Sequence, residues 1–175
     1  MKRTAIAYWL IPAEPERSFF ESVVVDLARR YNAPAFEPHM TIHVGSSGED
    51  VAEQAIAKAV SCCGAIEAKV LGTDHSGVFI KTLFVQFAPN AKLRRLNETI
   101  RNAAQNASDY QFKPHLSLLY KNIPIPVRRQ LTNSISLPFP EVLFDSIKAV
   151  RCASPTQSGA DVEAWRVLAT KELSG

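Results

Sequence analysis

Pro114-His115-Leu116-Ser117-Leu118-Leu119-Tyr120 is an apolar segment that carries an imidazole and a hydroxyl two residues apart. A second segment, Pro38-His39-Met40-Thr41-Ile42, repeats this pattern in the first half of the chain, and its histidine precedes His115 by 76 residues (115 − 39). In a β-strand, residues i and i+2 project from the same face, about 6.6 Å apart. If both segments are strands, each presents one imidazole and one hydroxyl to the same space. Two such strands side by side would surround a small anionic group with four polar side chains.

The composition suits a globular protein with one core. The chain has 175 residues, of which 46% are hydrophobic and 21% are charged, and a chain of this length can bury a sizeable core in one domain. No segment approaches the ~20 apolar residues of a membrane-spanning helix, so no membrane partner is expected. The apolar residues 4–11 follow Lys2 and Arg3, but the run is short for a signal peptide and has no clean cleavage site. It therefore predicts a strand.

Cysteine usage and charge indicate the compartment and the kind of partner. Cys62, Cys63 and Cys152 form no disulfide framework, which predicts a reduced, cytoplasmic protein. The net charge of +3 suits an anionic substrate but does not require nucleic acid. We expect a monomer that acts on a small molecule.

Hydrophobic periodicity and turn residues predict an α+β fold. Strands are expected at residues 4–11, 40–44, 66–73, 77–88, 113–120, 140–152 and 162–171, and helices at 16–31, 49–62, 91–106 and 126–134. Ser47 and Asp50 have the spacing of a capping box that would open the helix at 49–62. Asn90 is the expected N-cap of the helix at 91–106.

The two Pro-His-x-Thr/Ser segments resemble the 2H phosphoesterase superfamily, which is named for its two His-x-Thr/Ser motifs. Within this superfamily, the pattern is similar to that of the cyclic phosphodiesterases, which open cyclic phosphates on ADP-ribose and nucleosides. Tyr120, shortly after the second motif, strengthens the resemblance because that group carries a tyrosine there. The resemblance implies a single domain over residues 1–175 with two pseudo-symmetric lobes. Each lobe would be a small antiparallel sheet with helices outside, and the two sheets would line a central cleft.

Hydrolysis of a cyclic phosphate requires deprotonation of water, stabilisation of the pentacoordinate phosphate and protonation of the leaving oxygen. Two imidazoles can carry out both proton transfers near neutral pH, because their unperturbed pKa is about 6.5. The resemblance therefore implies that His39 and His115 are the acid and base, in an order that the sequence leaves open. Thr41 and Ser117 would donate hydrogen bonds to the non-bridging oxygens.

No cofactor or metal ion is expected, because no cluster with ligand spacing adjoins either motif. His43 shares strand parity with His39 and Thr41. On a strand, however, His39 and His43 would be ~13 Å apart and could not share an ion. We therefore expect His43 to lie beyond the site.

The resemblance also assigns residues outside the two motifs. It places Trp9 on the base-binding side of the cleft, with a core position as the alternative. It makes Phe79 part of an aromatic strand beside the substrate, and it allows Tyr120 to stack on the substrate or to hydrogen-bond to it. Three further residues have less direct expectations: Trp165 in the core, His75 in a solvated turn, and Lys113 either facing phosphate or solvated.

The expected function is metal-independent hydrolysis of a cyclic phosphate on a small nucleotide, either a 2′,3′-cyclic nucleotide or ADP-ribose 1″,2″-cyclic phosphate. Two alternatives stay open. One is an RNA end-processing enzyme of the same superfamily, either 2′,5′ ligase-like or a phosphodiesterase for cyclic-phosphate ends. The other is a non-catalytic nucleotide-binding module. The modest charge favours the small substrate over RNA, and the paired motifs argue against a module that only binds.

Overall fold

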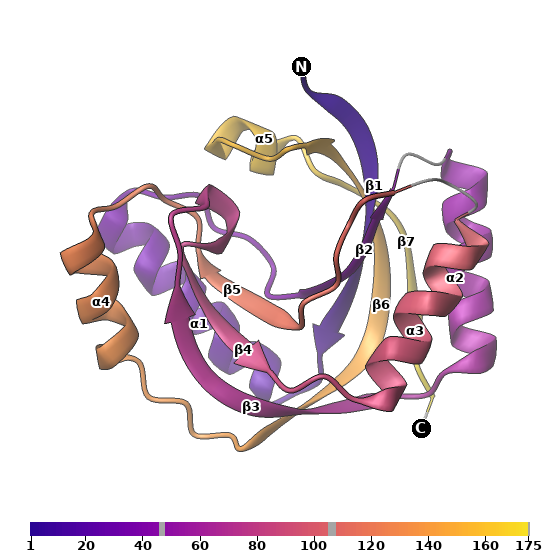
Figure 1. Cartoon of the computed structure of the whole chain (residues 1–175), viewed down its shortest axis with the longest axis horizontal. Helices are drawn as coiled ribbons and strands as arrows, with labels where there is room; N and C mark the ends of the chain where they lie inside the picture. The colour runs from indigo at the N-terminus through magenta and orange to yellow at the C-terminus, as the bar shows by residue number, and fades with distance from the viewer. Residues whose placement is uncertain (46–47, 105–107, 175) are drawn as a thin grey trace.

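The computed structural model describes residues 1–45, 48–104 and 108–174. It confirms the α+β class (Figure 1). The elements in chain order are β1 (Arg3–Pro12), α1 (Glu16–Tyr31), β2 (Met40–Gly45), α2 (Glu49–Cys62), β3 (Ile66–His75), the 3₁₀ turn η1 (Phe79–Lys81), β4 (Leu83–Phe87), α3 (Ala91–Ala103), β5 (His115–Leu119), α4 (Ile125–Ser134), β6 (Glu141–Ser154), α5 (Gly159–Glu163) and β7 (Arg166–Glu172). In the described part of the chain, no helix is both long and apolar enough to cross a membrane.

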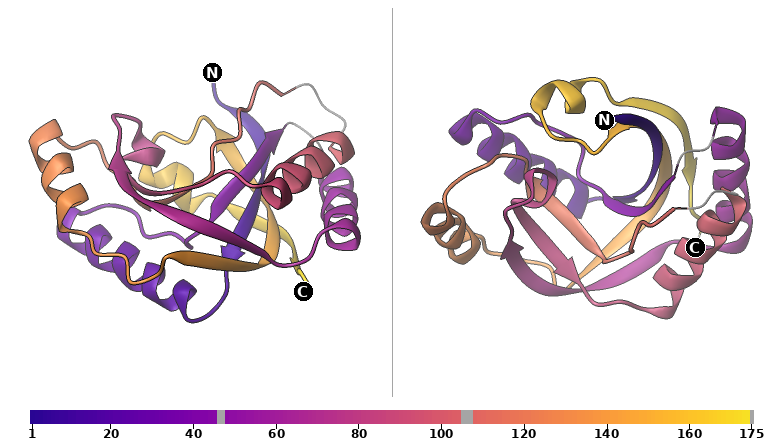
Figure 2. Two further views of the ribbon diagram at one scale, coloured as in Figure 1. Left: turned by 60° about the horizontal axis from the view of Figure 1, so that its bottom comes forward. Right: turned by 45° about the horizontal axis from the view of Figure 1, so that its top comes forward.

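The strand β6 joins the two halves of the molecule. Its first residues pair with β3, and the rest of the strand pairs with β1 on one side and β7 on the other. All these pairings are antiparallel, and the sheet order is β1-β2-β5-β4-β3-β6-β7, with β1 also paired to β6. The two expected sheets are therefore joined into one sheet that curves back on itself (Figure 2). Helices α2 and α3 cover one flank, and α1 and α4 lie on the opposite flank (Figure 1).

Strand β1 runs between two apolar layers. Ile6, Tyr8 and Leu10 point into the main core, whereas Ala7 and Trp9 belong to a smaller buried cluster on the other face. This division follows from the period of two in a strand. Burial on both faces explains why β1 reads as an almost continuous apolar run. The face with Trp9 is the one on which the candidate site lies.

The predicted strand at 77–88 begins with a turn instead. Val78, Phe79 and Ile80 favour a strand by type, but residues 79–81 form η1 and β4 begins at Leu83. The turn is stabilised because the Ser76 hydroxyl donates to the carbonyl of Lys81 at 2.5 Å. Together with the tertiary bond from the Thr82 hydroxyl to the Lys121 carbonyl at 2.7 Å, this contact overrides the strand preference of the segment.

The helix ends show which local signals held. Asn90 is the N-cap of α3, as predicted, and its side chain accepts from the Leu93 N–H. Residues 105 and 106 of the predicted helix lie outside the described residues, as does Ser47 of the expected capping box. The short helix α5 was not predicted, although Ser158 caps it by accepting from the Asp161 N–H.

Candidate active site

The four polar residues of the two motifs line one cavity of about 420 Å³. Met40 in β2 pairs with Leu116 in β5 in an antiparallel register. Extending this register by one residue in each direction aligns His39 with Ser117, and Thr41 with His115. Continued in this way, the register sets the imidazole of each motif across from the hydroxyl of the other.

Both histidines are held by the same backbone contact. His39 Nδ1 lies 2.7 Å from the carbonyl oxygen of Glu37, and His115 Nδ1 lies 2.7 Å from that of Lys113. A carbonyl oxygen only accepts hydrogen bonds, so Nδ1 carries the proton and Nε2 of the neutral ring is left as a base. In both motifs the repeated proline lies between the acceptor and the histidine, where its fixed φ restricts the backbone. The matching contacts explain why the proline recurs with the histidine.

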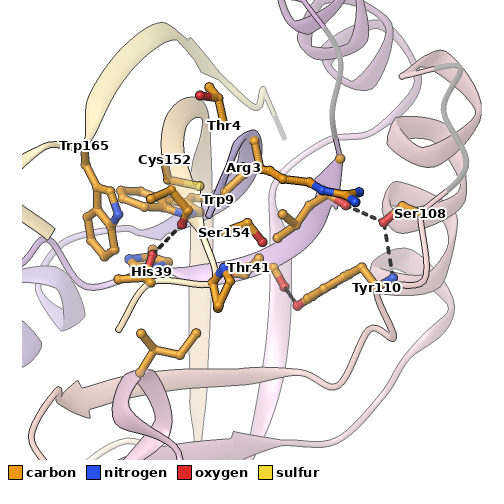
Figure 3. Close-up of a pocket in the computed structure, with 18 of the residues that line it drawn as sticks. Arg3, Thr4, Trp9, His39, Thr41, Ser108, Tyr110, Cys152, Ser154 and Trp165 are labelled. Atoms are coloured by element: carbon orange, nitrogen blue, oxygen red, sulfur yellow. Dashed lines mark hydrogen bonds between the residues drawn. The ribbon is translucent and has the colours of Figure 1, made fainter. Parts of the chain in front are cut away.

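The His39 ring is enclosed by aromatic side chains (Figure 3). It stacks on Trp9, with ring centroids 3.8 Å apart and planes 12° apart. Trp165 and Phe36 approach it edge-on at 6.0 Å and 6.3 Å, and the residue is 7% exposed. This burial lowers the pKa of His39 to about 4, and the nearby His115 adds to the effect. His39 is therefore neutral at pH 7.

His115 has a different environment from its counterpart. It is half-buried, and its ring meets the Phe84 ring at 5.6 Å and 75°. Burial lowers the pKa of His115, the Nδ1 bond to Lys113 opposes the shift, and the Lys81 ammonium adds to it. The two motifs therefore share a backbone geometry but differ in solvent access and in nearby charge.

The two motif hydroxyls are also not equivalent. Ser117 Oγ donates to the carbonyl of Ile80 at 2.7 Å, so its single proton is engaged. Thr41 is half-buried and lines the cavity. Its backbone carbonyl accepts from the Tyr110 hydroxyl at 3.2 Å, and the Ser108 hydroxyl donates to Val44 O at 2.6 Å (Figure 3). These bonds fix the segment that forms the cavity wall beside Thr41.

The expected aromatic residues divide between the cavity and its surroundings. Trp9 and Tyr120 line the cavity, and Phe79 does not. Phe79 lies in the η1 turn behind Tyr120, with ring centroids 6.0 Å apart, and not in the aromatic strand that the resemblance implies. Tyr120 is 3% exposed and stacks on Phe36 at 3.7 Å. Burial raises the pKa of Tyr120, so its hydroxyl stays protonated.

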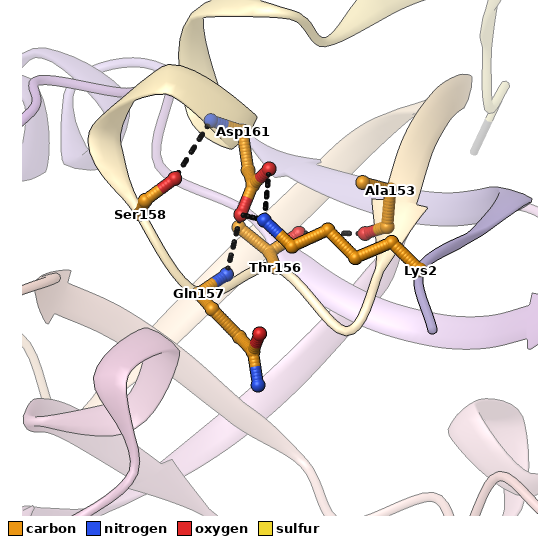
Figure 4. Close-up of polar contacts among 6 residues, drawn as sticks. All are labelled: Lys2, Ala153, Thr156, Gln157, Ser158 and Asp161. Carbon is orange, nitrogen blue, oxygen red and sulfur yellow. Dashed lines mark hydrogen bonds and ion pairs between the residues drawn. The ribbon is translucent and has the colours of Figure 1, made fainter.

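Trp165 is only in part the core residue that the sequence predicts. It packs against the smaller buried cluster, but it is half-buried and lines the cavity, with its ring edge-on to Trp9 at 5.0 Å. It follows α5 in the β6–β7 connection. That connection is tied to the N-terminus by an ion pair of 2.6 Å between Lys2 and Asp161 (Figure 4). The hydrogen bond from Lys2, aided by that from the Gln157 N–H, lowers the pKa of Asp161 to about 2.

His43 does not line the cavity, and strand parity alone does not explain its position. Trp9 pairs with Thr41 and Tyr8 with His43, so Ile42 is an extra residue in β2. This bulge reverses the alternation. The His43 side chain is 1% exposed, and its ring lies 6.2 Å from that of Tyr8. The prediction that His43 shares the face of Thr41 is therefore wrong.

Two other polar residues complete the comparison with the predictions. The Lys113 side chain is exposed, which is the solvated alternative of the two predicted, and it is the Lys113 carbonyl that contacts His115. His75 ends β3 and is half-buried, so it does not lie in a solvated turn. Across the residues that the structure describes, no group of three or more His, Cys, Asp or Glu side chains could hold a metal ion.

Several cavity residues were missed because they lie outside the two motifs. Arg3 lines the cavity, and the strand alternation that places Trp9 there would also have placed Arg3 there. Ser108 and Tyr110 line it from the segment before β5. No local pattern marks these two, because tertiary hydrogen bonds to β2 position them.

Comparison with known proteins gives a consistent result. The sequence model of a family described as cyclic phosphodiesterase-like protein matches residues 4–173. A cyclic phosphodiesterase of Arabidopsis thaliana is 24% identical over 126 residues, which cover 70% of this chain and 68% of that protein. A 2′,3′-cyclic-nucleotide 3′-phosphodiesterase of Kluyveromyces lactis is 25% identical over 217 aligned positions, with 97% of this chain and 99% of that protein covered. The crystal structure of E. coli LigT complexed with 3′-AMP superposes with a TM-score of 0.62 at 10% identity, covering 98% of this chain and 99% of that one, which shows a shared fold.

Proposed function

Because this chain belongs to the cyclic phosphodiesterase-like family of 2H phosphoesterases, we propose that it hydrolyses the cyclic phosphate of a small nucleotide with two histidines as acid and base. The candidate substrates are a 2′,3′-cyclic nucleotide and ADP-ribose 1″,2″-cyclic phosphate. One observation carries the proposal. The Nδ1 atoms of His39 and His115 are both bound to backbone carbonyls, and both rings line the same cavity. Each ring therefore has its Nε2 available for proton transfer.

The environments of the two rings support different roles for them. His39 is enclosed, and its pKa of about 4 keeps it neutral at pH 7, so it is the general base that takes a proton from water. His115 is more accessible and must be protonated to act as the general acid. The negative charge of a bound phosphate favours the imidazolium form and raises the pKa of His115 in the complex. Substrate binding thus creates the acid that protonates the leaving oxygen.

The hydroxyls stabilise the negative charge that builds up on phosphorus. Thr41 lies across from His115 in the register and lines the cavity, where it can donate to a non-bridging oxygen. Ser117 can donate to phosphate only after its hydroxyl turns away from the Ile80 carbonyl. Such donors are effective because they are aligned before the reaction and need no reorganisation as the charge develops.

Turnover assays with three substrates test this function. We would compare 2′,3′-cyclic AMP, ADP-ribose 1″,2″-cyclic phosphate and an RNA with a cyclic-phosphate end, each in the presence of EDTA. The yeast relative is named for 2′,3′-cyclic nucleotides, so this substrate class is tested first. His75→Gln is the matched control, because His75 does not line the cavity.

We expect hydrolysis of at least one small substrate by the wild-type protein and by His75→Gln. His39→Gln and His115→Gln should lose activity without loss of fold. The proposal fails if neither small substrate is turned over. It also fails if either cavity variant keeps full activity, or if EDTA abolishes activity and added metal restores it.

A further inference from the structure

Lys81 carries a cation close to His115. Its side chain is half-buried, and over residues 1–45, 48–104 and 108–174 it takes part in no ion pair. Lys81 Nζ lies 4.5 Å from the centroid of the Phe84 ring. Burial lowers the pKa of Lys81, and the Lys113 ammonium adds to this effect while Asp74 opposes it. An unpaired, partly buried cation costs free energy that a bound anion would offset.

Lys81 is not among the residues that line the cavity, but its contact with the Phe84 ring places its ammonium beside it. Phe84 pairs with Ser117, and its ring meets the His115 ring at 5.6 Å. The sum of this distance and the 4.5 Å from Lys81 Nζ to Phe84 is an upper limit of about 10 Å between Nζ and the His115 ring centroid. Ile80, the residue before Lys81, lines the cavity itself. A flexible lysine side chain can therefore reach an anion held between the two histidines.

The turn that carries Lys81 is fixed to the second motif strand. Thr82 is 2% exposed, donates its hydroxyl to the Lys121 carbonyl at 2.7 Å and accepts from the Lys121 N–H at 3.3 Å. Ser76 holds the Lys81 carbonyl from the other side at 2.5 Å. These bonds do not involve Ser117, so the turn stays in place whether the Ser117 hydroxyl binds Ile80 or phosphate.

We propose that Lys81 is an anion-binding residue of this site, which contacts a non-bridging oxygen of the phosphate on the side of His115. The inference rests on the proposed function for its substrate, a nucleotide cyclic phosphate. It adds a charged group to the hydroxyl donors of the two motifs. It also places that group on the side where the Ser117 proton is engaged with Ile80.

Lys81 also affects when His115 can act as an acid. Within the described residues, the charged or titratable side chains that act on His115 are Lys81 from η1 and His39 from the segment before β2, whereas Lys113 contributes its backbone carbonyl and its ammonium acts on Lys81. Lys81 opposes protonation of His115 in the free protein. When Lys81 binds the phosphate, its charge is compensated, and this opposition to protonation is removed.

The experiment compares Lys81→Met, Lys81→Gln and Lys81→Arg with the wild-type protein. Lys121→Met is the matched control, because Lys121 Nζ is directed to the Asn32 carbonyl at 3.1 Å. Binding of inorganic phosphate is measured by calorimetry, and kcat/KM is measured against pH. Even at the upper limit of about 10 Å, a unit charge at an effective dielectric constant of about 20 corresponds to a roughly tenfold change in binding, and a charge in contact with the phosphate has a larger effect. The two neutral Lys81 variants should therefore bind phosphate at least about tenfold more weakly, whereas Lys81→Arg and Lys121→Met should stay near the wild-type value.

The pH profile gives a second readout that a packing defect would not produce. Removing the charge of Lys81 should raise the pKa of His115 in the free protein and move the alkaline limb of kcat/KM to higher pH. If both neutral variants are folded by circular dichroism and bind phosphate as tightly as wild type, Lys81 is not an anion-binding residue. If wild type binds phosphate through Lys81 but turns over no cyclic phosphate, the proposed function fails and the anion site stands.

Discussion

The buried imidazole of His39 makes a quantitative prediction about stability in acid. Its pKa is about 4 in the folded protein, against 6.5 for an ordinary histidine. Between these values the unfolded chain binds a proton that the folded protein does not, so the folded state loses stability as the pH falls from 6.5 towards 4. At 1.36 kcal/mol per pKa unit, the loss is about 2 kcal/mol at pH 5 and about 3 kcal/mol at pH 4.

His39→Asn removes this titration and tests the magnitude. The asparagine amide can still donate to the Glu37 carbonyl that His39 Nδ1 contacts. Free energies of unfolding are measured by urea denaturation at pH 7.5 and at pH 5.0, for wild type, for the variant and for His75→Asn as a histidine outside the cavity. Taking the difference between wild type and variant at each pH cancels the titration of the carboxylates that both proteins share.

The wild type should lose about 2 kcal/mol relative to His39→Asn between the two pH values, and His75→Asn should follow the wild type. A difference that stays constant within about 0.5 kcal/mol, the usual scatter of a neutral surface change, would refute the argument. It would mean that the enclosure by Trp9 and its neighbours does not keep His39 neutral, and the assignment of His39 as the base would lose its physical reason.

Three further outcomes are expected from kinetics. His39→Ala and His115→Ala should each lower kcat by ~10²–10⁴, the usual contribution of a positioned acid or base, and the double variant should be little worse than the worse single variant in steady-state assays. Thr41→Ala should cost ~2–4 kcal/mol in kcat/KM by loss of one donor, whereas Thr41→Ser keeps the hydroxyl and should cost much less; equal losses would show that Thr41 only packs the strand. Trp9→Leu should expose the stacked face of His39 to solvent and move the acid limb of kcat/KM to higher pH. The KM ratio of 2′,3′-cyclic AMP to 2′,3′-cyclic CMP should stay unchanged, and a large selective rise in one KM would instead show that Trp9 stacks on the base.

Local sequence was sufficient for the two motif strands and the fold class. Alternation around His39 and His115, and the turn residues between elements, act over a few residues, so they can be read from the chain directly. The repeated proline and the i, i+2 spacing also placed an imidazole and a hydroxyl on one face in each motif. The prediction that the two motif strands lie together came from the resemblance to a known family, because periodicity alone does not indicate which strands are neighbours.

The tertiary structure determined the positions of several residues that local sequence patterns do not predict. A single extra residue, Ile42, turns His43 into the core, because a bulge shifts the parity of every residue after it. Phe79 lies in a turn, because the bond from the Ser76 hydroxyl to the Lys81 carbonyl and the tertiary bond from the Thr82 hydroxyl to the Lys121 carbonyl outweigh a strand preference of at most about 1 kcal/mol. Trp165 reaches the cavity only because the β6–β7 connection folds back over it.

The difference between two nearly identical histidines also lies beyond the sequence. His39 and His115 follow the same Pro-His pattern and make the same bond to a backbone carbonyl. Three aromatic rings pack around His39: Trp9 from β1, Phe36 from the segment before β2, and Trp165 from the β6–β7 connection. His115 instead has the Lys81 side chain of η1 nearby. A pKa depends on the solvent and charge around a group, and these come from segments far apart in the chain. The motif therefore identifies two matched imidazoles, and in the proposed mechanism only the packing around them distinguishes the base from the acid.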